Sequence, residues 1–186
     1  MREMQTANQL SGRATGALFF TGFGALWFIL ALYVREQLHR AVIAGLLTGL
    51  AALVLAAILL LRAAKRWPRV ADDPAVNRTF NRVNTAQWIA VGLFAFTLAR
   101  LHLDAYIPSA ITAIVGLHLF PLARLFHNPL HYGTGALLLL WVGTGILFVP
   151  AGELQGSAAL GTGVILWLSA AITLVMGLLG ARQPAQ

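Results

Sequence analysis

The chain has 186 residues, of which 59% are hydrophobic and only 10% are charged. Because an average soluble domain is about one quarter charged, this composition excludes an ordinary water-soluble globule and makes lipid the expected solvent for most of the surface. The formal net charge is +7, and the absence of cysteine excludes disulfides, thiolate metal sites and thiol catalysis.

Six stretches without charged residues are long enough, or nearly so, to cross a hydrocarbon core of about 30 Å as α-helices. With their flanking residues, they predict helices at about 14–34, 41–61, 74–99, 105–126, 129–150 and 154–181. The expected fold is therefore all-α, a polytopic membrane protein in which residues 1–186 form one transmembrane domain, a six-helix bundle.

Local signals mark two of the predicted helix starts. Asp73 followed by Pro74, and Asn128 followed by Pro129, each pair a residue that caps helices with one that favours the first helical position. Small residues four apart are also expected to let helices approach closely. These are Gly12 with Gly16, Gly45 with Gly49, and Gly152 with Gly156.

The cations are divided unequally between the two sides of six crossings. One side carries Arg2, Arg13, Arg62, Lys65, Arg66, Arg69, Arg78, Arg82, Arg124 and Arg182, and the other carries Arg35, Arg40 and Arg100. Because cytoplasmic loops are enriched in Lys and Arg, both termini are expected in the cytoplasm. Cations grouped between apolar runs indicate contact with the phospholipid bilayer and no nucleic acid partner.

The predicted fourth helix contains the strongest candidate residue. His118 falls near its middle, where an ionisable group is costly unless it faces the bundle interior. Pro121 has no N–H to bond the carbonyl of Leu117, so a free acceptor lies next to His118. This predicts a polar ligand-binding spot, and the alternative is a neutral His118 that simply bonds a neighbouring helix.

Three tryptophans, Trp27, Trp141 and Trp167, fall near the centres of their helices, although tryptophan usually prefers the membrane interfaces. If they converge on His118, they would line an amphipathic cavity for a small or lipid-like ligand. The alternative is that they are scattered packing residues.

The start of the predicted third helix is polar. Asn77, Asn81, Asn84 and Trp88 follow helical spacing, and Gln87 carries the polarity into the membrane. The predicted fourth helix returns to the same side, so Arg124 should lie at similar depth and attract an anionic group. The alternative is a solvated face that touches phospholipid.

His127 and His131 are four apart, a spacing that can hold a metal when both lie on one helix face. Pro129 disfavours helical geometry at Asn128, so the two histidines are expected on opposite sides of a helix boundary. No cofactor or metal is therefore expected, and no acidic residue falls at a membrane centre.

The run from Gly116 to Ala123 (GLHLFPLA), followed by Tyr132 to Gly135 (YGTG), resembles a stretch in small uncharacterised multi-pass bacterial integral membrane proteins. The resemblance implies a helical bundle and no particular activity. An arginine-rich, lysine-poor composition also favours a bacterial source, and hence the bacterial cytoplasmic membrane.

The sequence thus predicts a membrane protein that binds a small or lipid-like molecule, and the hypothesis includes anionic ligands. In its extended form, the protein also translocates this molecule across the membrane. The expected site combines His118, Arg124, Asn84, Gln87 and Trp88 with the three tryptophans. Two alternatives stay open: an intramembrane enzyme with a histidine-based site, which is less favoured, and a non-catalytic membrane assembly partner. A homo-oligomer is also left open.

Overall fold

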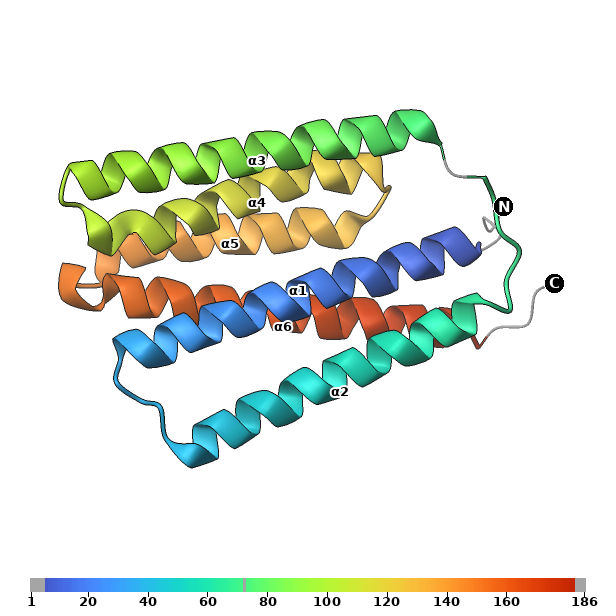
Figure 1. The fold of residues 1–186 in the computed structure, drawn as a ribbon, viewed down its shortest axis with the longest axis horizontal. Coiled ribbons are helices and arrows are strands. Elements are labelled where there is room, and N and C mark those ends of the chain that lie inside the picture. The colour runs from blue at the N-terminus through green and yellow to red at the C-terminus, as the bar shows by residue number, and fades with distance from the viewer. Residues whose placement is uncertain (1–5, 72, 183–186) are drawn as a thin grey trace. The chain divides into compact units, whose positions relative to one another are not determined.

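The computed structural model describes residues 6–71 and 73–182, and over these ranges the chain is helical and has no β-strand. Its elements in chain order are α1 (Ala7–Val34), α2 (Arg40–Ala64), α3 (Pro74–Arg100), the 3-10 turn η1 (Asp104–Tyr106), α4 (Ile107–Leu125), α5 (Pro129–Phe148) and α6 (Ala151–Gly180) (Figure 1). The all-α class is confirmed. Arg2, which was counted on the cytoplasmic side, lies outside the described residues.

Five helices are long and apolar enough to cross a membrane: α1, α2, α4 with its preceding turn η1, α5 and α6. The helix α3 has a comparable length of 27 residues, but polar Asn and Arg side chains fill its first turns and lower its mean hydropathy. The five apolar helices indicate a membrane protein. A sixth crossing by α3 does not follow from its composition alone.

The first helix begins at Ala7, seven residues before the predicted start at Ala14. The Oγ1 atom of Thr6 accepts a hydrogen bond from the N–H of Gln9, and Oε1 of Gln9 accepts one from the N–H of Thr6, each at 3.2 Å. This reciprocal pair is a capping box. It starts the helix in the polar segment before the apolar run, so the start at Ala14 was wrong.

Both predicted proline-marked helix starts are confirmed. Asp73 caps α3 by accepting a 2.7 Å hydrogen bond from the N–H of Ala75, and Asn128 caps α5 by accepting one of 3.2 Å from the N–H of Leu130. Each cap satisfies one of the backbone donors that a helix start leaves unpaired.

Pro150 sets the boundary between α5 and α6, which differs from the predicted boundary. Val149 is extended, as expected for a residue before proline, so α5 ends at Phe148 and not at 150. The last helix then begins at Ala151 and not at 154, which places Glu153 in its first turn. A carboxylate there faces the positive end of the helix dipole.

The chain folds as two compact units, each described by itself. The first unit comprises Met1–Ala25, His39–Asp72 and Leu166–Gln186, and the second comprises Leu26–Leu38 and Asp73–Ile165. The helices α1 and α6 therefore contribute one part to each unit.

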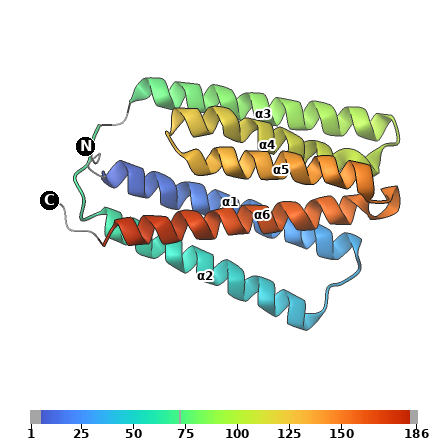
Figure 2. The same ribbon diagram turned by 180° about the vertical axis from the view of Figure 1, so that it is seen from behind.

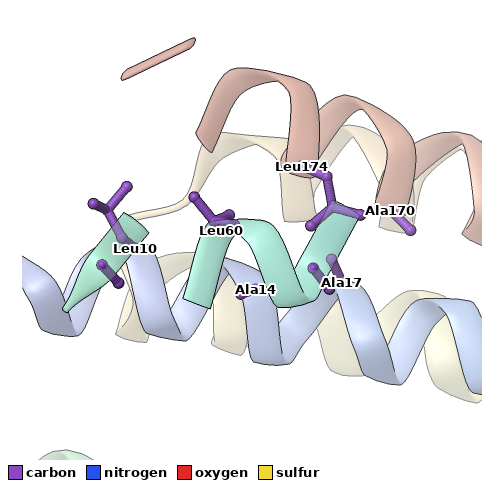
Figure 3. Close-up of a cluster of buried hydrophobic side chains, with 8 residues drawn as sticks. Leu10, Ala14, Ala17, Leu60, Ala170 and Leu174 are labelled. Atoms are coloured by element: carbon purple, nitrogen blue, oxygen red, sulfur yellow. The ribbon is translucent and has the colours of Figure 1, made fainter. Parts of the chain in front are cut away.

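The first unit packs α1, α2 and the end of α6 around a buried cluster (Figure 3). Its members are Leu10, Ala14 and Ala17 of α1, Ala57, Leu60 and Ala64 of α2, and Ala170 and Leu174 of α6. On each helix they recur at spacings of three or four residues, which places them on one face. Alanine at five of these eight positions allows close van der Waals packing, the main attraction between helices in lipid.

In the second unit α4 lies between α3 and α5, and the three helices run side by side (Figures 1 and 2). The helices α4 and α5 come closest at two glycines: a Cβ atom on Gly135 would lie 2.7 Å from the carbonyl oxygen of Gly116. A buried 2.8 Å hydrogen bond between the hydroxyls of Thr112 and Thr162 links α4 to the first half of α6.

The glycine pairs predicted from spacing do not make the close helix contacts expected of them. Within the described residues, a Cβ atom on Gly12, Gly16, Gly45 or Gly152 would meet nothing within 4 Å. Of the six glycines, only Gly49 and Gly156 lie against a neighbour, and each contacts a side chain and not a backbone. Spacing along one helix does not reveal which face meets another helix.

Candidate ligand site around His118

His118 is half-buried on α4, in the second unit. The backbone of Val83 on α3 lies near its ring. The Nδ1 atom is buried and has no hydrogen-bond partner among the described residues. A neutral imidazole has one donor and one acceptor nitrogen, so Nδ1 is a polar atom that this ring can offer to a ligand.

A second histidine lies nearby. His131, in the first turn of α5, is half-buried and lies near His118. Its Nδ1 atom is 3.4 Å from Nδ2 of Asn128, the residue that caps α5. The structure therefore brings His131 of α5 near His118 of α4.

His127 lies outside this pair. It is exposed and has a left-handed backbone, with φ of 49°, in the three-residue connection between α4 and α5. His127 and His131 therefore do not share a helix face, which confirms the prediction from Pro129. The enzyme alternative from the sequence requires His102, His118, His127 and His131 to converge, and of these the structure brings His131 near His118.

Two ring contacts join the three helices at the end where His131 lies. Phe80 of α3 packs on Phe126, at the end of α4, with ring centroids 5.9 Å apart. Phe120 of α4 meets Tyr132 of α5 edge to face at 5.8 Å. Edge-to-face geometry is a favourable arrangement for aromatic rings, so these pairs help to position α3, α4 and α5. Sequence reasoning did not single out these four residues.

The polar residues predicted on α3 and α4 differ in burial. Asn84 and Gln87 are half-buried, and Asn84 directly follows Val83, whose backbone approaches His118. Trp88 is 51% exposed, and Arg124 is exposed in the last turn of α4. At that position the guanidinium complements the negative end of the helix dipole. Among the described residues, no hydrogen bond joins the side chain of Asn84, Gln87 or Arg124 to His118.

Two of the three tryptophans pack between helices. In the first unit, Trp167 donates a 2.9 Å hydrogen bond from Nε1 to the carbonyl of Thr21, and its ring covers Gly49 of α2. In the second unit, Trp141 lies against Gly161 of α6. Trp27 is 8% exposed on α1. The contacts of Trp141 and Trp167 are those of packing residues, the alternative considered from the sequence.

The described residues contain no group of three or more His, Cys, Asp or Glu side chains that could hold a metal. His102, like His127, has a left-handed backbone in a connection, with φ of 58° between α3 and η1. The histidines that lie close together are therefore His118 and His131.

No family model, curated protein or solved structure matches the chain. The chain is therefore classified by the features of its own structure. It is an all-helical chain with five apolar helices of membrane-spanning length, and its second unit holds a histidine pair between two of its helices.

Proposed function

We propose that this chain is a multi-pass integral membrane protein of the bacterial cytoplasmic membrane that binds a small or lipid-like molecule at His118. In this proposal α3 is the sixth crossing and both termini face the cytoplasm. Thirteen Lys and Arg residues divided ten to three between the two sides support that orientation.

The observation that carries the proposed site is the buried Nδ1 atom of His118, which has no partner among the described residues. A buried polar atom left without a hydrogen bond costs about 1–3 kcal/mol. A ligand group that bonds this nitrogen would recover that free energy. A histidine with only a packing role would instead bond through both ring nitrogens or expose one of them to water.

The neighbours of His118 suggest the chemistry of the ligand. His131 and Asn84 add polar groups on the two flanking helices, α5 and α3. The helices α4 and α5 are otherwise largely apolar, so a ligand with one polar group and an apolar body fits best. An acidic polar group would gain further attraction whenever either imidazole is protonated.

The nearness of His118 and His131 also favours a second candidate function, that of an intramembrane enzyme. Two neighbouring imidazoles can exchange a proton with a bound molecule. Such an enzyme would convert the molecule that binds at His118. Mass analysis of that molecule before and after incubation with the purified protein separates this candidate from simple binding.

The proposal is tested with three proteins: the wild type, His118→Leu and the matched control His127→Asn, which removes a histidine from the connection and suits its left-handed backbone. Each is purified in mild detergent, and its bound molecules are extracted and identified by mass spectrometry. We expect one species to be retained by the wild type and the control, and reduced about tenfold in His118→Leu, as the loss of one buried hydrogen bond predicts. Equal retention by all three proteins, or none by the wild type, contradicts the proposal.

A further inference from the structure

The first unit contains a pocket that is separate in sequence and composition from the residues around His118. It has a volume of about 380 Å³ and lies between the start of α1, the end of α2 and the segment that follows α2. Its lining includes the apolar Ile58 and Leu61 and three small residues, of which Ala7 and Ala64 are buried and Ser11 is half-buried. Because the three small side chains are short, the two helices leave a hollow between them.

Three exposed cations surround this hollow: Arg62 in the last turn of α2, Lys65 at its C-cap, and Arg69 in the segment beyond. No acidic residue is among the described residues that line the pocket. Three like charges around one hollow repel each other unless an anion neutralises them. The pocket is therefore suited to a negatively charged group.

A helix C-terminus attracts cations by itself, and this explains Arg62 and Lys65. It does not explain Arg69, which lies beyond the helix. Three hydrogen bonds hold the segment around Arg69 against the start of α1. The Asn8 side chain bonds both backbone groups of Val70, at 2.8 and 3.1 Å, and the N–H of Ala7 donates to the carbonyl of Pro68 at 2.9 Å.

The hydrogen bonds are made on both sides of Arg69, so they fix the backbone from which its guanidinium extends. The neighbouring Trp67 is half-buried and packs against the hydrophobic cluster of this unit. Tryptophan beside Lys and Arg at the end of an apolar helix is typical of the membrane interface. In the topology proposed above, the pocket therefore lies where α1 and α2 reach the head-group layer.

We propose that this pocket binds the phosphate-bearing head group of an anionic membrane phospholipid, with Arg62, Lys65 and Arg69 around the phosphate and Ser11 available as a hydroxyl donor. The proposal rests on membrane insertion, which is part of the proposed function, but not on a ligand at His118. The apolar surface of α1 and α2 supplies the contact for the acyl chains, and guanidinium groups bond phosphate oxygens well.

The experiment is a titration of the purified full-length protein, followed by native mass spectrometry. The probes are phosphatidylglycerol, phosphatidylcholine and inorganic phosphate. We expect tighter binding of phosphatidylglycerol than of phosphatidylcholine. The double variant Arg62→Gln/Arg69→Gln should weaken the binding of phosphatidylglycerol about 25-fold, because the attraction of one Lys or Arg to an anionic lipid corresponds to about fivefold.

A matched control removes two cations elsewhere. The variant Arg78→Gln/Arg82→Gln has the same net charge as the test variant and carries its changes on α3, so we expect its affinity to stay within about twofold of the wild type. Asn8→Ala changes no charge but removes the side chain that holds Val70. It should weaken binding by less than the removal of one cation, and its unfolding curve shows whether the fold is kept.

Three results would overturn the proposal: an equal loss of affinity in both double variants, no preference for the anionic lipid, or binding of inorganic phosphate alone that depends on the same residues and equals the binding of the lipid. The variant His118→Leu should bind phosphatidylglycerol as the wild type does. Failure of the pocket therefore leaves the proposed site at His118 intact, and failure at His118 leaves the pocket intact.

Discussion

Buried hydroxyl groups in the second unit show how single residues satisfy polar atoms without water. The Oγ1 atoms of Thr112 and Thr162 are 2.8 Å apart, and each also lies 2.7–2.8 Å from the carbonyl four residues earlier on its own helix. Two hydroxyl protons cannot fully serve three contacts. When one hydroxyl donates to the other, it gives up the bond to the carbonyl on its own helix, so the bonds of the two residues depend on each other.

This coupling predicts the outcome of a double-mutant cycle. Thr112→Val and Thr162→Val should each lower the free energy of unfolding, and their combined effect should be smaller than the sum. We expect a coupling energy of about 0.6 kcal/mol, the average for hydrogen bonds between membrane helices. The measurement is equilibrium unfolding in mixed detergent micelles.

Thr173 supplies the control for this cycle. Its buried hydroxyl donates 2.7 Å to the carbonyl of Ser169 on its own helix, so Thr173→Val combined with Thr112→Val should give additive effects. Additive effects for Thr112 and Thr162 as well would show that their contact contributes nothing to stability.

At the scale of the helices, close approach depends on the atoms opposite a glycine. A Cβ atom on Gly135 of α5 would lie 2.7 Å from the backbone oxygen of Gly116 on α4, and a backbone atom cannot rotate away. On the same helix, Gly143 is exposed, and a Cβ atom there would meet nothing within 4 Å. The two glycines therefore have different structural roles although both lie inside α5.

Gly135→Ala should consequently lower the free energy of unfolding by about 1–3 kcal/mol, the usual effect of overfilling a packed site. Gly143→Ala is the matched control and should be neutral or stabilising by up to about 1 kcal/mol, because alanine favours helix formation. Both variants are measured by equilibrium unfolding in detergent. Equal effects of the two substitutions would mean that α4 and α5 are not in close contact at Gly135.

At the scale of the whole molecule, the number of membrane crossings depends on α3. At about 1.5 Å per residue, its 27 residues reach about 40 Å, enough to cross the hydrocarbon core with the polar first turns outside it. The described residues of α3 include no buried side chain, and the large apolar ones in its second half are exposed. A long exposed apolar surface is expected on a helix that faces lipid.

Because the chain has no cysteine, single cysteine variants can locate α3 without a background signal. A membrane-impermeant thiol reagent should label Thr79→Cys from the cytoplasmic side and His102→Cys from the opposite side. It should not label Leu93→Cys from either side. Labelling of Thr79→Cys and His102→Cys from the same side would contradict a crossing by α3 and the proposed six-span topology.

Local rules were enough to predict much of the helical framework from the sequence. The caps at Asp73 and Asn128 follow from side chains that bond nearby backbone groups. The helical conformation of the apolar runs follows from the need to satisfy backbone polar groups in lipid. The capping box of Thr6 and Gln9 was also present in the sequence. An uncharged run marks only the apolar part of a helix, so it does not predict the polar first turns of α1.

The contacts between helices could be decided only by the tertiary structure. The sequence singled out His118 and His131 separately, but it did not give their nearness, the contact of Gly116 with Gly135, or the hollow lined by Ala7 and Ala64. Each of these depends on the rotation and register of one helix against another. A helix that is apolar on all sides does not indicate which face meets its neighbour, so short-range signals determine where helices begin and end, and packing determines what they bring together.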